Sequence, residues 1–133
     1  MLNEVNVLIR IALGQIEVIP GRPDLNTRLI LEMIEEARRL DVQMVIFPEM
    51  AVPGYLLGDT WEQDAFLKDC EAYGRQIIES SRDGMCLLFG NVGIDWGRMD
   101  DDGRVWKYNA FFVAKDGKLH GGENFPYPFR IKT

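Results

Sequence analysis

A strongly amphipathic helix between two short apolar segments is the feature that most constrains this fold. Across residues 25–40, apolar side chains recur every three or four positions, and charged side chains fill the other side. Residues 5–18 (VNVLIRIALGQIEV) run apolar with few polar interruptions, and residues 44–47 (MVIF) are wholly apolar, which is typical of strands covered on both faces. Strand, helix and strand in this order predict a right-handed crossover and parallel pairing. We expect Asp24 to cap the helix.

The rest of the chain continues the alternation of strands and helices. The pattern predicts a helix over 66–77 that stops at Asp83-Gly84, a buried strand over 85–94, a polar turn over 98–104, a strand from 106 with a tight turn at Asp116-Gly117, and an irregular end over 121–133. The predicted order is β-α-β-α-β-β, an α/β fold. Both helices fall on one side of the sheet. Nothing in the sequence clearly covers the other side, so the chain reads as half of a layered sandwich.

The charge and the apolar segments exclude several classes of partner. The net charge is -6 and no Lys/Arg cluster breaks it, so nucleic acid is not an expected partner. No apolar run approaches the roughly 20 residues of a membrane helix, and the first residues lack the features of a secretory signal. We therefore expect no membrane contact and a cytoplasmic location.

Neither the cysteines nor the acidic residues suggest a disulfide framework or a metal site. Cys70 lies in a predicted helix between two acidic residues, which raise a thiol pKa and weaken a nucleophile. Cys86 lies in a predicted strand, where cysteine acts as a small apolar side chain. We interpret both as structural. The run Asp100-Asp101-Asp102 is similar to half of a calcium loop but lacks the closing glutamate, so we expect a solvated hairpin end.

Glu49 is the strongest candidate for chemistry. It follows the second strand directly in the run FPEMAVPGY, at the carboxyl end where parallel sheets place their sites. The surroundings are apolar, and desolvation there would raise the pKa of a carboxylate into the range of a general base. The alternative interpretation is a solvated residue at a strand end.

The run FPEMAVPGY is similar to the strand-end motif of the carbon–nitrogen hydrolase (nitrilase) superfamily. The opening RIALGQIEVIPGRPDLNTRLILEMIEEA resembles the first strand and helix of that family, and LLFGNVGIDWGRMDDDGRVWKYNAFFVAKDGK resembles its later hairpin with a Tyr-Asn pair, Tyr108 and Asn109. The resemblance implies part of an α-β-β-α sandwich. It implies that residues 1–133 are the N-terminal part of one such domain, truncated before the nucleophilic cysteine.

The ending GENFPYPFRIKT resembles the glutaminase domain of glutamine-dependent NAD synthetases. The resemblance implies that Glu49 is the general base, that Lys132 stabilises the oxyanion, and that Tyr55 lines the glutamine pocket. The alternatives are a solvated Lys132 and a loop tyrosine that packs on its neighbours. The family's cysteine nucleophile would lie beyond residue 133.

The resemblance implies a parent enzyme that hydrolyses glutamine through a thioester and passes ammonia to NAD synthesis. This segment would need no cofactor, because ATP and Mg would bind a separate synthetase domain that is absent here. We expect glutamine or another small amide as substrate, assembly as a homo-oligomer, and no turnover by the 133-residue chain alone. Two alternatives stay open, namely another amidase of the superfamily and a non-catalytic α/β assembly module.

Overall fold

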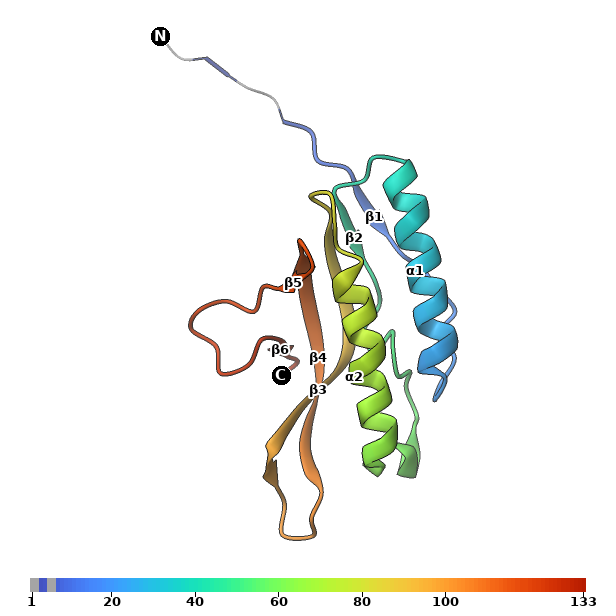
Figure 1. Cartoon of the computed structure of the whole chain (residues 1–133), viewed down its shortest axis with the longest axis vertical. Helices are drawn as coiled ribbons and strands as arrows, with labels where there is room; N and C mark the ends of the chain where they lie inside the picture. The colour runs from blue at the N-terminus through green and yellow to red at the C-terminus, as the bar shows by residue number, and fades with distance from the viewer. Residues whose placement is uncertain (1–2, 5–6) are drawn as a thin grey trace.

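The computed structural model describes residues 3–4 and 7–133, which form one mixed sheet with helices on one side (Figure 1). The elements, in chain order, are β1 (Ile11–Leu13), α1 (Pro23–Arg39), β2 (Met44–Ile46), the 3-10 helix η1 (Gly58–Glu62), α2 (Asp64–Glu79), β3 (Cys86–Met99), β4 (Val105–Lys115), β5 (Lys118–Leu119) and β6 (Arg130–Ile131).

The pairing of the strands confirms the predicted α/β class and order. Strands β1, β2 and β3 are parallel neighbours, with Ile11 opposite Met44 and Met44 opposite Cys86. Strand β4 returns antiparallel to β3 as a long hairpin, and both β5 and β6 pair with the outer edge of β4. The predicted turn between β4 and β5 is confirmed by the positive φ angles of Asp116 (55°) and Gly117 (74°).

The first helix begins differently from the sequence prediction. Arg22 is the residue before the helix and Pro23 is its first residue, a position where the missing N–H of proline costs nothing. Asp24 lies in the first turn and makes no capping hydrogen bond. Its carboxylate pairs instead with the guanidinium of Arg22 at 2.9 Å. The prediction of Asp24 as the cap was wrong, because the helix begins at Pro23, two residues earlier than a cap at Asp24 implies.

Helices cover one face of the sheet and leave the other face exposed. Helices α1 and α2 pack on one face, where side chains such as Val45, Leu87 and Phe89 are fully or almost fully buried. On the other face Leu13 is 67% exposed and Phe111 is 44% exposed. The described chain supplies no layer over this second face, as the sequence predicted.

The predicted first strand, over residues 5–18 and covered on both faces, was wrong in extent and in burial. Residues 5 and 6 lie outside the described residues. Only Ile11–Leu13 pair with β2, and the apolar side chains of residues 7–9 are exposed. After β1 the chain bends away at Gly14, where an added β-carbon would come within 2.4 Å of the Phe47 ring.

Two further boundaries differ from expectation. Strand β3 runs to Met99 rather than ending near residue 94, so the polar turn is confined to residues 100–104. The end of the chain is not wholly irregular, because Arg130–Ile131 pairs with β4. Phe129 anchors it by packing its ring 5.3 Å from that of Phe112. No helix in the described part of the chain has the length and apolar character needed to cross a bilayer.

Candidate active site

Glu49 lies in a tight turn that crosses over β3. The backbone of Phe47 donates a hydrogen bond to the carbonyl of Leu88, and the backbone of Gly90 donates one to the carbonyl of Pro48. The turn lies so close to β3 that a β-carbon at Gly90 would come within 2.3 Å of the Met50 nitrogen. Because glycine at position 90 has no side chain, the turn can pack directly against β3. This close packing determines the position of the Glu49 backbone.

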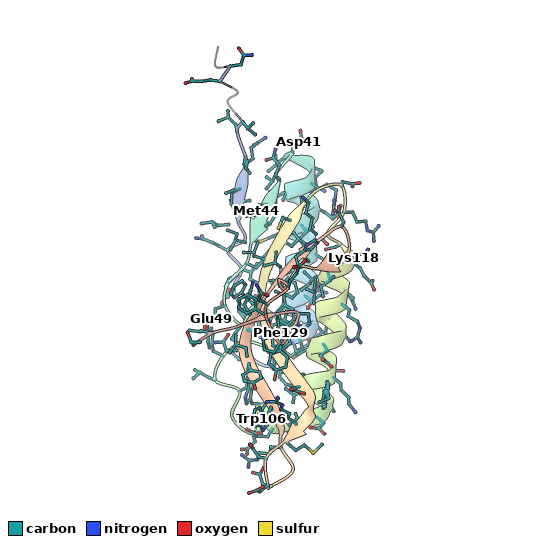
Figure 2. The ribbon with its side chains drawn as sticks, turned by 90° about the vertical axis from the view of Figure 1, so that its left-hand side faces the viewer. Asp41, Met44, Glu49, Trp106, Lys118 and Phe129 are labelled. Carbon is teal, nitrogen blue, oxygen red and sulfur yellow. The ribbon has the colours of Figure 1, made fainter. Side chains whose placement is uncertain are left out.

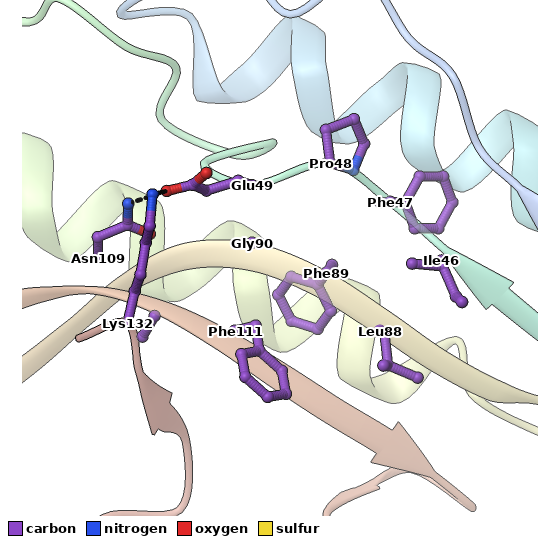
Figure 3. A pocket seen from close by; sticks show the side chains of 11 residues that line it. Ile46, Phe47, Pro48, Glu49, Leu88, Phe89, Gly90, Asn109, Phe111 and Lys132 are labelled. Atoms are coloured by element: carbon purple, nitrogen blue, oxygen red, sulfur yellow. Dashed lines mark hydrogen bonds and ion pairs between the residues drawn. The ribbon is translucent and has the colours of Figure 1, made fainter.

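The carboxylate of Glu49 lies on the side of the sheet away from the helices, as Figure 2 shows with α2 at the right. There it meets two residues that are distant in the sequence (Figure 3). The Lys132 ammonium group donates to Oε1 of Glu49 at 2.5 Å, across 83 positions of sequence. The Asn109 side-chain amide donates to the same oxygen at 2.5 Å. The structure thus brings together the two residues that the sequence singled out for catalysis.

Cross-strand pairing places Lys132 beside Asn109. The backbone N–H of Lys132 donates to the carbonyl of Asn109 at 2.9 Å, which continues the β4–β6 ladder by one residue. Residues opposite one another on paired strands project their side chains to the same face. Lys132 is therefore held at the site by its backbone as well as by its charge.

The ion pair sets the electrostatics of Glu49. The hydrogen bond from Lys132 lowers the pKa of Glu49 to about 2, with further lowering by Tyr55 and Asn109. Desolvation acts in the opposite direction but is smaller, since the Glu49 side chain is 39% exposed. The prediction of a raised pKa at Glu49 was wrong, because the cation outweighs the apolar surroundings.

A pocket of about 370 Å³ opens beside this cluster. Its walls are mostly apolar, and its polar side chains gather at one end; the lining includes Ile46, Leu88, Phe111, Glu49, Asn109 and Lys132. A carboxylate can accept a proton there, and an ammonium group can stabilise negative charge on an oxygen. This arrangement suits a reaction in which a proton moves away while an oxyanion forms.

Tyr55 lies near Glu49 but does not line this pocket. It follows Gly54, whose φ of 85° turns the loop, and its side chain is 46% exposed. Desolvation and the charge of Glu49 raise the pKa of Tyr55 to about 12, so the phenol stays protonated. Its contact with a substrate stays a prediction.

The two cysteines lie away from the pocket. Cys70 is fully buried on α2, and burial, followed by the charges of Asp69 and Glu71, raises its pKa to about 12. This confirms its interpretation as a structural residue. Cys86 begins β3 and is partly exposed rather than fully buried, because its strand position faces the uncovered side of the sheet. Burial still raises the pKa of its thiol.

The acidic hairpin end is solvated, as expected. Asp100 accepts a hydrogen bond from the Trp106 indole at 3.1 Å, and Asp102 pairs with Arg104 at 3.1 Å. Among residues 3–4 and 7–133, no group of three His, Cys, Asp or Glu side chains is arranged to hold a metal ion.

Sequence reasoning placed Asn109 in a resembling motif but did not select it as a site residue. Two signals point to it in retrospect. Asparagine is depleted in strands, yet it stands in the middle of β4. It also lies directly opposite the position that Lys132 takes in the ladder, which only the register of β6 reveals.

Known proteins share this sequence pattern and fold. The sequence profile of the family described as Carbon-nitrogen hydrolase matches residues 10–124. The glutamine-dependent NAD(+) synthetase of Xanthomonas campestris pv. campestris (strain 8004) is 32% identical over 112 residues, which cover 84% of this chain and 19% of that protein. The chain thus spans about a fifth of the length of such relatives and corresponds to their N-terminal part.

Two solved structures illustrate the shared fold. A crystal structure of a glutamine-dependent NAD(+) synthetase from Cytophaga hutchinsonii matches with a TM-score of 0.72 and 24% identity, covering 85% of this chain and 18% of that one. A variant of the amidase from Nesterenkonia sp. AN1 matches with a TM-score of 0.68 and 21% identity, covering 84% and 40%. In that amidase the acetamide moiety of fluoroacetamide is attached covalently to the active-site cysteine.

Proposed function

Because the chain belongs to the carbon–nitrogen hydrolase family, we propose that it is part of an amidase domain that hydrolyses the side-chain amide of glutamine. The observation that carries the proposal is the Glu49–Lys132 ion pair at the polar end of the pocket. A proton acceptor can activate a nucleophile, and a nearby cation can stabilise the oxyanion that forms when the nucleophile attacks an amide carbonyl.

In the proposed reaction Glu49 accepts the proton of an attacking thiol. The S–H bond breaks as a bond forms from sulfur to the amide carbon, and the carbonyl electron pair moves to oxygen, beside the Lys132 ammonium group. The intermediate collapses when the C–N bond breaks, and ammonia leaves with the proton held by Glu49. Water then attacks the thioester while Glu49 takes its proton. The C–S bond breaks, the leaving sulfur takes that proton back from Glu49, and glutamate and the thiol are released.

The low pKa of Glu49 is compatible with this role. At rest, Lys132 holds the carboxylate charged, and a carboxylate with a pKa of about 2 is a weak base. When an oxyanion develops nearby, the Lys132 ammonium group is drawn toward it and stabilises Glu49 less. The pKa of Glu49 then rises as the proton arrives, which matches the acceptor to its task.

The similarity to glutamine-dependent NAD(+) synthetases supports a particular fate for the ammonia. In the proposed parent protein it amidates a nicotinate dinucleotide at a separate synthetase domain that uses ATP and Mg. A cytoplasmic location and assembly as a homo-oligomer belong to the same proposal.

The thiol in this proposal is neither Cys70 nor Cys86. Neither lines the pocket, and both have raised pKa values. Cys86 lies four residues before Gly90, the residue that contacts the backbone of Glu49, a separation of about 13 Å along the extended strand β3. The nucleophile would come from a segment outside these 133 residues, and the chain alone would not turn over glutamine.

A second amidase function is favoured by one observation. The pocket walls beside Glu49 are apolar, contributed by residues such as Ile46, Leu88 and Phe111. A small amide with an apolar acyl group would suit them better than the charged amino acid end of glutamine does. Such a substrate would match the likeness in fold to the Nesterenkonia amidase.

The test uses the natural polypeptide that carries this sequence, isolated from its source and with its mass determined. It compares the rates at which this polypeptide releases ammonia from different amides. We expect ammonia from glutamine, and a loss of at least about a hundredfold in rate in Glu49→Gln and in Lys132→Met. Asp101→Asn, at the solvated hairpin end, is the matched control with unchanged rate. Faster release from butyramide than from glutamine would favour the second function. Release by the 133-residue chain after both cysteines are replaced by serine would refute the thiol mechanism.

A further inference from the structure

Asn109 contacts both members of the ion pair through different groups. Its side-chain amide donates to Oε1 of Glu49 at 2.5 Å, and its backbone carbonyl accepts the N–H of Lys132 at 2.9 Å. One residue of β4 thus links the turn after β2 to the strand that carries the lysine.

The sheet itself gives no reason for asparagine at this position. Asn109 lies within β4 opposite Val92 of β3, where a β-branched or aromatic residue would favour the strand. Its side chain projects to the face without helices, is half-buried, and makes its one hydrogen bond among the described residues with Glu49. The amide is therefore accounted for by the carboxylate that it meets.

The two donors to Oε1 respond differently to a proton on Glu49. The attraction of Lys132 is electrostatic and depends on the negative charge of the carboxylate. The amide N–H of Asn109 is neutral and can donate to a carboxylate oxygen or to the carbonyl oxygen of a carboxylic acid. Protonation of Glu49 thus removes the main reason for Lys132 to stay and leaves the bond from Asn109 possible.

We propose that Asn109 is a positioning residue that holds the Glu49 carboxyl group in both of its protonation states, while Lys132 holds it only when it is charged. This inference rests on the proposed function and deepens it. When Glu49 takes the thiol proton, Lys132 is released toward the oxyanion, and Asn109 keeps the protonated carboxyl group aimed at the leaving nitrogen. Without this tether the neutral side chain, already 39% exposed, would turn toward solvent.

The first experiment replaces the protonated carboxyl group by its neutral isostere, Glu49→Gln, in the 133-residue chain labelled with ¹⁵N. We expect the Asn109 side-chain amide to keep its NOE contacts to the side chain at position 49. We expect the Lys132 ammonium signal to be visible in the wild type at low temperature and to broaden through solvent exchange by at least about tenfold in Glu49→Gln. Loss of the Asn109 contacts together with the lysine signal would overturn the proposal.

The second experiment removes the tether itself. In Asn109→Leu the pKa of Glu49, followed by its carboxyl ¹³C shift, is expected to rise, while the Lys132 signal persists because the charges remain. Asn124→Leu, in the exposed loop before β6, is the matched control and leaves both unchanged. In the natural polypeptide, Asn109→Leu is expected to lower kcat about tenfold with little change in KM. An unchanged kcat in Asn109→Leu would contradict the role.

The two proposals can fail separately. The NMR measurements need no substrate, so persistent Asn109 contacts without ammonia release would contradict the glutaminase function alone. Ammonia release that depends on Glu49 but is indifferent to Asn109 would contradict the positioning role alone.

Discussion

Gly90 lies directly beneath Glu49, and a β-carbon at position 90 would come within 2.7 Å of the carbonyl carbon of Glu49. The same β-carbon would meet the carbonyl oxygen of Pro48 at 2.6 Å. These are backbone atoms, so no side-chain rotation can relieve the contact. The position of the candidate base therefore depends on the absence of a side chain on the neighbouring strand.

Gly90→Ala is expected to lower the free energy of unfolding by about 2 kcal/mol or more, because the turn must lift from β3. Urea titration of the 133-residue chain measures the change. Gly97→Ala is a matched control in the same strand, since its β-carbon would meet only the flexible Asp95 side chain at 3.3 Å. A loss in Gly90→Ala no greater than in this control would contradict the close packing.

Acid is expected to remove the stabilisation that Glu49 contributes. Its pKa in the folded chain is about 2, below the ordinary value of 4.5, so the contribution is complete above pH 4.5 and is lost as pH falls toward 2. The pair is well exposed, and solvent screening limits the effect to less than about 1 kcal/mol. Unfolding free energies measured between pH 6 and pH 3 should fall less steeply in Lys132→Met than in the wild type. Equal slopes would show that the pair contributes nothing.

The two thiols are expected to differ in reactivity toward an aromatic disulfide at pH 8. Cys86 is partly exposed and should react slowly in the folded chain. Cys70, fully buried with a pKa of about 12, should react only after denaturant is added. Cys86→Ser should thus abolish labelling under native conditions. Rapid labelling of that variant would mean that α2 opens readily.

The exposed apolar face is expected to drive self-association of the isolated chain. Leu13 and Phe111 lie on this face and are 67% and 44% exposed, and β1 leaves one strand edge unpaired in the described chain. Sedimentation velocity should show oligomers whose share grows with concentration. The double variant Leu13→Lys and Phe111→Lys should shift the chain toward monomer, whereas Leu56→Lys, a 97% exposed loop position, should not. A wild-type chain that stays monomeric would refute this expectation.

Periodicity in the sequence predicted most of the fold. The helical spacing in residues 25–40 and the apolar segment at 44–47 correspond closely to α1 and β2, because local patterns record which face is buried. The first strand failed because its apolar residues resemble a strand covered on both faces, although only one face is covered here. Local pattern shows that a side chain is suited to burial but does not show which layer buries it.

The sequence predicted two residues of the candidate site, Glu49 and Lys132, but not the direction of the pKa shift of Glu49. The position of Glu49 at a strand end followed from local sequence, and Lys132 followed from resemblance. The lowered pKa of Glu49 depends on contacts with residues 60 and 83 positions away, which no local pattern contains. Asn109 escaped selection for the same reason, since its partner in the ladder is set by the register of β6.

Strand β6 contains only two residues, and it carries Lys132 to Glu49. So short a ladder can fray and re-form while β3 and β4 stay paired, because local opening costs far less than global unfolding. The population of chains with the cation in place is then governed by a local equilibrium rather than by the stability of the sheet. Amide hydrogen exchange at Lys132 would report the fraction of chains in which β6 is paired with β4 and Lys132 lies beside Glu49.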